Sequence, residues 1–309
     1  MRRLSILVAA AALLIAGAAA AQNAHDNPGF APGPQNDPDT CRDLWQGVGL
    51  PQYSRPDERD TTIVCHTRYV LSHNNDALTP DWVLEHLTVE QISGSNTRPK
   101  MKFQHETLVP RGAVDADYVS SGFDRGHQAP SDDFKANVDW MKESFFLSNI
   151  VPQVGIGFNR DIWAKLEMHV RDIVRDRGEL YVMTGPVYPN GSQPIAITGA
   201  ANKCGNDIVL DPPPKKAVCG KASQCEDGVI VPSAMYKIIY DPNLGVANAF
   251  LMPNINHRNA KNFSDPLDYI AKFQVTVQAV ESVTDVDFLQ GLPQDLRRPV
   301  ETQCAGMIR

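Results

Sequence analysis

Two stretches near the start of the chain alternate apolar with polar residues. They cover residues 61–73 (TTIVCHTRYVLSH) and 81–91 (DWVLEHLTVEQ), and both are rich in β-branched side chains. A period of two sends successive side chains to opposite faces of a strand. The pattern therefore predicts two strands of an antiparallel sheet, one in each stretch. Residues 94–122 have instead the mixed polar composition of a loop.

The clearest helix is predicted to begin at Asn159. Behind it, apolar residues recur at helical spacing, namely Ile162, Trp163, Leu166, Val170, Ile173 and Val174. Gly178 stands where a glycine commonly ends a helix. We therefore expect one amphipathic helix between these two residues.

The second half of the chain mixes strands and helices. Residues 180–184 read as a buried strand, and residues 231–240 and 246–252 as a hairpin. A short helix is expected near Pro266, and the Pro- and Cys-containing stretch 189–229 reads as a long insertion. Because no regular strand–helix–strand rhythm is present, the pattern predicts an α+β fold with a central, mostly antiparallel sheet flanked by helices.

The first residues read as a targeting segment. Residues 1–21 combine a short basic start, an apolar run and a small-residue end, which is typical of a cleaved secretory signal. Residues 22–40, rich in Pro, Gly, Asn and Asp, read as a flexible leader, and 41–309 as a single domain. We therefore expect an exported protein, periplasmic or extracellular, with no membrane anchor after signal cleavage, because no other stretch is apolar for ~20 residues.

Six cysteines fit that expectation. An even number in an exported chain favours disulfides, and Cys41 and Cys65 are placed to close a local loop. The pairing of all six cannot be derived, because six cysteines allow fifteen arrangements. The absence of a CxxC pair and of histidines at zinc spacing argues against a zinc knuckle.

Charge and common motifs narrow the choice of function. The formal net charge is −7, which is not the footprint of a typical nucleic-acid binder, although it says little about one local cleft. The chain contains no HExxH, GxSxG or phosphate-loop motif. His127, in SGFDRGHQAPSDDFKAN, has no second histidine or cysteine close enough in sequence to share a metal.

One stripe of the predicted helix offers chemistry. Asn159, Trp163, Glu167 and Arg171 follow one another at steps of four residues and therefore share a face. A purely structural interpretation makes Asn159 an N-cap and Glu167–Arg171 a surface ion pair worth ~0.2–0.5 kcal/mol. A chemical interpretation makes the same stripe a site for a hard cation and a phosphate.

An ordered set of motifs resembles the DNA/RNA non-specific endonucleases. DRGH at 124–127 resembles that family's signature, and SNI with PQ at 148–153 resembles the segment that follows it. The helix pattern N-x₃-W-A-x-LE-x₃-R from Asn159, the TGP and VPSA strands at 184–186 and 231–234, and Thr97-Arg98 complete the likeness. DRGH alone would be a weak motif, but the ordered set covers about residues 64–293 and is specific.

The resemblance implies a ββα-metal (His-Me finger) active site and a role for each matching residue. His127 would be the general base, Asn159 the protein ligand of one hydrated Mg²⁺, and Glu167 the acid that orients its waters. Mn²⁺ is expected as a substitute ion. The residues expected to contact phosphate are Arg98, Arg125 and Arg171, with Lys100 and Lys102 extending the basic groove.

This chemistry suits the residue types. A neutral imidazole, with an unperturbed pKa of ~6.5, can take the proton of an attacking water near neutral pH. A single amide and a single carboxylate favour one Mg²⁺ that keeps most of its waters over a two-metal site. We therefore predict an endonuclease that hydrolyses phosphodiester bonds in both DNA and RNA.

Two departures from the family pattern leave alternatives open. The 189–229 insertion carries Cys204, Cys219 and Cys225, and Asp132-Asp133 makes the stretch after His127 more acidic. A phosphodiesterase of narrower specificity and a catalytically disabled nucleic-acid-binding protein remain the alternatives. A homodimer is compatible with the sequence but does not follow from it.

Overall fold

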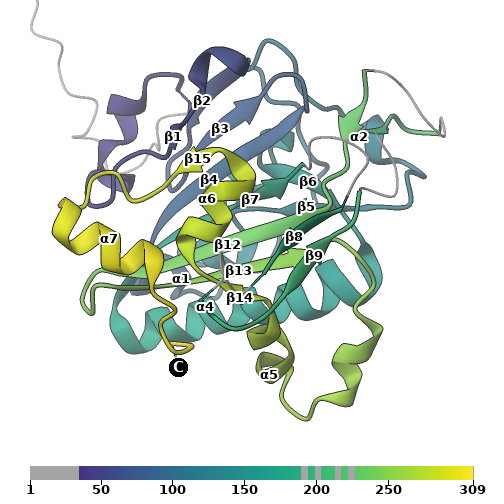
Figure 1. The fold of residues 1–309 in the computed structure, drawn as a ribbon. Coiled ribbons are helices and arrows are strands. Elements are labelled where there is room, and N and C mark those ends of the chain that lie inside the picture. The colour runs from purple at the N-terminus through teal and green to yellow at the C-terminus, as the bar shows by residue number, and fades with distance from the viewer. Residues whose placement is uncertain (1–34, 189–193, 199–202, 213–216, 222–226, 309) are drawn as a thin grey trace, which may run out of the picture. The chain divides into compact units, whose positions relative to one another are not determined.

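The computed structural model describes residues 35–188, 194–198, 203–212, 217–221 and 227–308 (Figure 1). The predicted signal at 1–21, most of the predicted leader and parts of the insertion lie outside these residues. The last residues of the predicted leader belong to the fold, because Gln35 forms two backbone hydrogen bonds with Cys65, at 2.9 and 2.7 Å.

A seven-stranded sheet forms the centre, and all of its neighbouring strands are antiparallel. In spatial order the strands are β14 (Gln274–Val275), β13 (Val246–Pro253), β12 (Ala234–Asp241), β7 (Glu179–Val187), β4 (Thr79–Thr88), β3 (Val70–Asn74) and β2 (Thr61–Cys65). The predicted α+β class and the predicted hairpin of β12 and β13 are confirmed.

The two predicted N-terminal strands need a correction. Residues 61–73 form a hairpin rather than one strand, because the chain turns between His66 and Tyr69, whose backbone N and O lie 2.9 Å apart. The strand predicted at 81–91 ends at Thr88, where one helical turn, α1 (Val89–Ile92), begins. The side chain of Gln91 accepts a hydrogen bond from the Thr88 N–H at 2.9 Å and so caps this turn.

The sheet is covered on both faces. Along β7, Leu180 and Val182 pack towards α4 (Ala164–Arg177), whereas Tyr181 and Met183 pack into the cluster on the opposite face, which α6 (Val277–Thr284) covers. Figure 1 shows α4 running beneath the sheet and α6 lying across its front. Successive side chains of β7 are thus buried on opposite faces of the sheet. A strand that is apolar at every position is expected to be covered on both faces in this way.

The DRGH and SNI-x-PQ motifs pair with each other. β5 (Asp124–His127) and β6 (Ile150–Gln153) form a separate antiparallel pair, in which His127 lies opposite Ile150. Gly126 is required at its position, because a Cβ there would lie 2.2 Å from the side chain of Gln153. The chain then passes into a wide helical turn, Gly155–Trp163, and from there into α4.

The predicted helix therefore begins earlier than Asn159. The Asn159 N–H donates to the carbonyl of Val154, five residues back, at 2.9 Å, which is the geometry of a π turn. Asn159 is inside this turn and is not an N-cap. The predicted end is confirmed, because Gly178 has a φ of 97° and donates its N–H to Val174 O at 2.8 Å.

Smaller elements complete the fold. They are β1 (Gln52–Tyr53) paired with β15 (Val286–Asp287), β8 (Ile195–Ile197) paired with β9 (Ile208–Leu210), β10 (Ala217–Val218) paired with β11 (Val229–Ile230), and the helices α2 (Asp115–Tyr118), α3 (Val138–Glu143), α5 (Pro266–Ile270) and α7 (Gln294–Thr302). The predicted loop 94–122 thus contains α2. The predicted helix near Pro266 is confirmed as α5.

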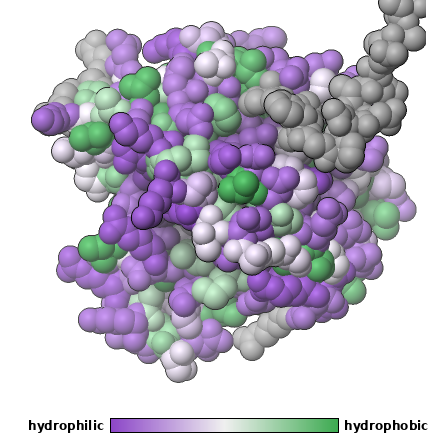
Figure 2. Space-filling view, turned by 180° about the vertical axis from the view of Figure 1, so that it is seen from behind, coloured by the Kyte–Doolittle hydropathy of each residue, from purple (hydrophilic) through white to green (hydrophobic). Residues whose placement is uncertain are grey.

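Disulfides tie the ends of the chain to the fold. Cys41 pairs with Cys65 and closes the local loop expected from the sequence, and Cys204 pairs with Cys304 across 100 positions. Cys219 is disulfide-bonded as well. In the part of the chain that the structure describes, we find no helix both long and apolar enough to cross a membrane. The face shown in Figure 2 is dominated by hydrophilic side chains, with apolar ones scattered among them.

Candidate active site

A cleft of about 320 Å³ opens between β5, the wide turn and the start of α4. Its lining contains five of the six predicted site residues: Arg98, Arg125, His127, Asn159 and Glu167. The other lining residues are Pro130, Ser131, Asp132, Arg160 and Ala164. Segments more than sixty positions apart are therefore brought together as the motifs predicted.

His127 is held by aromatic packing. Its ring lies 5.4 Å from the ring of Phe103 and 5.2 Å from that of Phe145, edge-on to the latter. Nε2 is buried without a hydrogen-bond partner, and no described residue bonds to Nδ1. Burial, together with the positive charge of Arg98, lowers the pKa of His127 to about 3. The imidazole is therefore neutral at physiological pH and can accept a proton from the cleft.

Asn159 is oriented by Asp124. The Asn159 Nδ2 donates to Asp124 Oδ2 at 3.0 Å, which fixes the amide so that Oδ1 carries no hydrogen bond from a described residue. Arg160 donates to both oxygens of the same carboxylate, at 2.6 and 2.5 Å. Burial alone would raise the pKa of Asp124, but these hydrogen bonds and the arginine charges hold it below its usual value.

The free amide oxygen and Glu167 together suit a hard cation. Both residues line the cleft, and both offer oxygen, the donor type that Mg²⁺ prefers. Asn159 and Glu167 supply one amide and one carboxylate oxygen, so an ion held by this pair would keep most of its waters. The donor set therefore fits the metal that the motif resemblance implies.

Two arginines supply positive charge to the cleft. The Arg98 guanidinium stacks over the Phe145 ring, 4.8 Å from its centre, and its side chain is exposed. Arg125 forms an ion pair with Asp115, in which Nη2 lies 2.7 Å from Oδ1. The Nε of Arg125 is buried and has no hydrogen-bond partner among the described residues. Aromatic faces and a carboxylate thus hold both guanidinium groups in place.

The pKa of Glu167 is shifted towards neutral pH. Burial raises the pKa of Glu167 to about 7, while the ammonium of Lys237 lowers it and the carboxylate of Asp133 raises it. Near neutral pH this side chain is therefore divided between its protonated and ionised forms.

Arg171 lies elsewhere than predicted. It does not line the cleft, its side chain is only 10 % exposed, and it forms a 2.6 Å ion pair with Asp133. This placement does not support the predicted contact between Arg171 and a phosphate. On the predicted stripe, Trp163 and Arg171 are buried, whereas Asn159 and Glu167 line the cleft.

Behind Glu167 lies a buried charge cluster that the sequence reading missed. Lys237 on β12 is 1 % exposed and donates to Thr184 Oγ1 at 2.6 Å. Burial lowers the pKa of Lys237 and raises that of Glu85, on β4, well above its usual value. Both residues lie among apolar ones in strands that pack against α4. A charged residue inside an apolar strand is the sequence signal that could have revealed the cluster.

The SNI motif supports the loop that follows the histidine. The side chain of Asn149 bonds to both the N–H and the carbonyl of Ala129, at 2.9 Å each, and to Ser144 O at 2.9 Å. It is fully buried. The motif is therefore a clamp that fixes the segment carrying His127.

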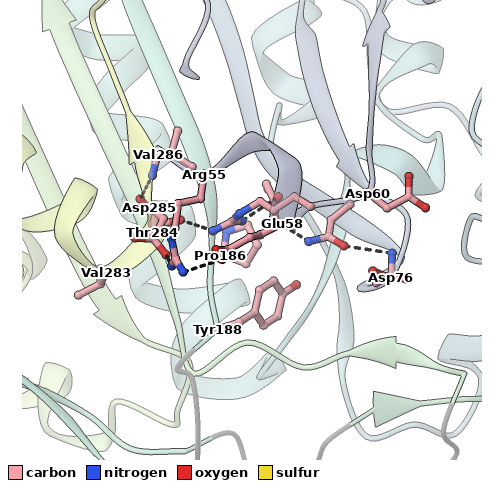
Figure 3. A pocket seen from close by; sticks show the side chains of 13 residues that line it. Arg55, Glu58, Asp60, Asp76, Pro186, Tyr188, Val283, Thr284, Asp285 and Val286 are labelled. Atoms are coloured by element: carbon pink, nitrogen blue, oxygen red, sulfur yellow. Dashed lines mark hydrogen bonds and ion pairs between the residues drawn. The ribbon is translucent and has the colours of Figure 1, made fainter. Parts of the chain in front are cut away.

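A second cavity, of about 280 Å³, has a different character (Figure 3). Its arginines are already paired with its carboxylates: Arg55 with Asp285 at 2.5 Å and Arg59 with Asp81 at 3.0 Å. Arg59 also donates to Thr284 O at 2.6 Å. These interactions join the strands of the sheet edge to the end of α6, so the cavity is a structural junction.

The chain matches the model of the DNA/RNA non-specific endonuclease family over residues 49–295. It is 31% identical to the mitochondrial nuclease of Saccharomyces cerevisiae over 256 residues, which is 78% of this chain and 70% of that protein. It is 35% identical to a nuclease of Syncephalastrum racemosum, over 72% of this chain and 66% of that one. Human mitochondrial nuclease EXOG is 31% identical, over 74% of this chain and 57% of its own length.

A solved structure shares the fold. The crystal structure of the EndoG/EndoGI complex, which concerns EndoG inhibition, matches with a TM-score of 0.63 and 28% identity. The match covers 83% of this chain and 94% of that one.

These comparisons correct the predicted location. Several of the similar proteins, from Saccharomyces cerevisiae, Homo sapiens and Caenorhabditis elegans, are mitochondrial nucleases. The periplasmic or extracellular location predicted from the first residues is therefore wrong. The fold, the ordered motifs and the family match agree on the rest: this chain belongs to the DNA/RNA non-specific endonuclease family, and it is a nuclease of the hydrolase class.

Proposed function

We propose that the chain is a Mg²⁺-dependent endonuclease that hydrolyses phosphodiester bonds of DNA and RNA without sequence preference. One observation carries the proposal: a neutral His127 and the amide oxygen of Asn159, neither of them hydrogen-bonded to a described residue, line the same cleft. A base that is not tied to a metal and an oxygen ligand that is available to one are what a one-metal hydrolysis needs.

His127 acts as the general base. As a water oxygen bonds to phosphorus, one of its protons passes to the ring nitrogen of His127 that carries no hydrogen. The bond between phosphorus and the 3′-oxygen breaks, and that oxygen takes a proton from solvent water. The products are a 5′-phosphate end and a 3′-hydroxyl end. A general base of this kind typically contributes ~10²–10⁴-fold to the rate.

The other cleft residues bind the ion and the phosphate. Asn159 would bind the Mg²⁺ and Glu167 would orient its waters, and the ion would supply positive charge to the phosphate and the leaving oxygen. Arg98 and Arg125 bind phosphate oxygens through forked, permanently charged groups. Because such contacts carry no base information, this set gives little sequence preference.

The test compares the unmodified chain with His127→Ala and Asn159→Ala on plasmid DNA and on RNA. We expect digestion of both substrates with Mg²⁺, loss of digestion with a chelator, and at least a 10²-fold lower rate for each variant. Mn²⁺ serves as the comparison ion. Equal rates for His127→Ala and the unmodified chain, or full activity in chelator, would overturn the mechanism.

Asp132 at the cleft rim favours a second candidate, a phosphodiesterase of narrower specificity, because a carboxylate beside the phosphate path repels a polyanion. Comparing a dinucleotide with long duplex separates the two functions. Faster turnover of the dinucleotide would support the narrower enzyme.

A further inference from the structure

The wide turn Gly155–Trp163 has two sides. Asn159 and Arg160 face the active-site cleft, whereas Ile156, Gly157 and Asp161 line a separate cavity of about 340 Å³. The opposite wall of this cavity is the segment that follows β13, from Asn256 to Pro266. The two cavities therefore share one backbone segment as a wall.

This cavity, called here the basic hollow, is rimmed by unneutralised cations. Lys165, Arg258 and Lys261 line it, all three are exposed, and none forms an ion pair with a described residue. The one lining carboxylate, Asp161, accepts a hydrogen bond from the Gly157 N–H at 2.6 Å. Three such cations at one place in a chain of net charge −7 create a local positive field.

The lining also offers apolar surface. Ile156 is 70% exposed although it belongs to a structured turn, and Phe263 forms part of the cavity wall. The ammonium of Lys272 lies over the Phe263 ring, 4.6 Å from its centre. Apolar surface beside cations suits a ligand that alternates phosphates with sugars and bases.

The basic hollow is preformed. His257 is 5% exposed and bonds through Nδ1 to Tyr269 Oη at 3.0 Å and through Nε2 to Pro253 O at 2.7 Å. Gly157, with a φ of 84°, allows the turn to approach Asn256, because a Cβ there would lie 2.1 Å from the Asn256 Oδ1. The two walls are therefore fixed against each other before any ligand binds.

We propose that the basic hollow binds the sugar-phosphate backbone of the substrate strand on one side of the scissile bond. The inference rests on the proposed nuclease function and adds a second binding region to it. Arg258 and Lys261 contact phosphates, and Ile156 packs against the strand. Cleavage of long strands thus depends on charges that do not line the reaction cleft.

The experiment uses the full chain and a double variant, Arg258→Ala with Lys261→Ala. The matched control is Lys142→Ala with Arg175→Ala, which removes the same charges from exposed residues paired with Asp139 and Asp172. We measure kcat/KM on long duplex DNA and on a short oligonucleotide between 50 and 200 mM salt, and binding to long duplex in chelator. Each phosphate contact contributes about 0.9 to the slope of log affinity against log salt.

We expect the double variant to lose about 1.8 from that slope, because two phosphate contacts are removed. The double variant should lose at least fivefold more kcat/KM on long duplex than on the short oligonucleotide. This loss should appear as a higher KM, with kcat unchanged. Slopes equal to those of the control variant, or equal losses on both substrates, would overturn the inference. Absence of cleavage by the unmodified chain would instead refute the proposed function, while the binding slopes in chelator would still test the basic hollow.

Discussion

The surroundings of two titratable residues in the cleft shift their pKa values in opposite directions. Burial among aromatic rings keeps His127 neutral, whereas burial beside Asp133 keeps Glu167 close to half ionised near neutral pH. The pair follows a general rule, in which environments that push two pKa values in different directions assign different roles.

The pH dependence of cleavage follows from this difference. The pKa of His127 is about 3, so its base form is present throughout the neutral range, and the acidic limb belongs to Glu167, with a pKa of about 7. Because Glu167 must be ionised to orient the waters of a cation, log kcat/KM should rise with unit slope below about pH 7 and level off above it. The midpoint should fall as Mg²⁺ is raised, since the cation and the proton compete.

The pH–rate profile of Glu167→Gln provides the check. This variant should be slow and should lack the limb near pH 7. A limb that persists in Glu167→Gln would assign the titration to another group.

At the scale of elements, the β5–β6 pair and α4 carry the site, and Asn149, which directly precedes β6, binds the segment that follows β5. We expect Asn149→Ala to destabilise the protein by about 3 kcal/mol, because it removes three buried hydrogen bonds and leaves the Ala129 N–H unpaired. For a chain of this size that is a fall in melting temperature of roughly 6–12 °C.

Calorimetry of Asn149→Ala against Asn243→Ala measures this, because Asn243 lies at an exposed hairpin turn and its side chain donates only one solvent-exposed hydrogen bond to a described residue, to Arg177 O at 3.2 Å. The control should change the melting temperature by less than about 2 °C, since surface substitutions are usually within ~0.5 kcal/mol. Equal melting temperatures for the two variants would show that the clamp does not stabilise the loop.

The motifs predicted His127, Asn159 and Glu167 together through their resemblance to the family. In the structure β5 pairs with β6, and β6 leads into the wide turn and α4, which brings the three residues to one cleft. The turn around Asn159 was not predictable from spacing. A helical period of 3.6 places Asn159 and Arg171 on one stripe, but the π turn shifts Asn159 away from it. Spacing likewise cannot show whether a residue on a stripe faces a cleft or a sheet, and Arg171, predicted to contact phosphate, is buried beside Asp133.

The pairing of Asp124 with Asn159 and Arg160 was missed for a related reason. These partners are 35 and 36 positions apart and meet only because the wide turn follows β6 directly. Lys237 was missed because alternation identifies a strand without identifying which polar residue on it is buried. The sheet itself was predictable, since apolar strands dominate the pattern.

At the scale of the whole molecule, covalent and hydrogen bonds join the C-terminal segment to distant parts of the described chain. Cys204–Cys304 connects the insertion to the C-terminal segment, where Ile308 O accepts a hydrogen bond from His169 on α4 at 2.8 Å. Asn248 on β13 also accepts from the Ile308 N–H, at 2.6 Å. The last described residues thus contact both α4 and β13.

We expect Cys204→Ser with Cys304→Ser to lower the free energy of unfolding by about 2–5 kcal/mol, because the bridge closes a loop of 100 residues in the unfolded chain. Activity at low temperature should be retained, since neither cysteine lines the cleft. Denaturant titration of the variant against the oxidised protein, with thiol content checked in both, makes the comparison. An unchanged midpoint would show that the bridge contributes nothing to stability.

The contact between Lys237 and Trp163 should affect the fluorescence of the protein. The ammonium of Lys237 lies 5.2 Å from the centre of the Trp163 ring, and Trp163 precedes Glu167 by one helical turn. Indole emission responds to nearby charge, so protonation of this buried cluster should alter the intrinsic fluorescence of the protein. Trp163 therefore reports the electrostatic state beneath α4 without a substrate or a label, and its signal adds to that of Trp45, Trp82 and Trp140.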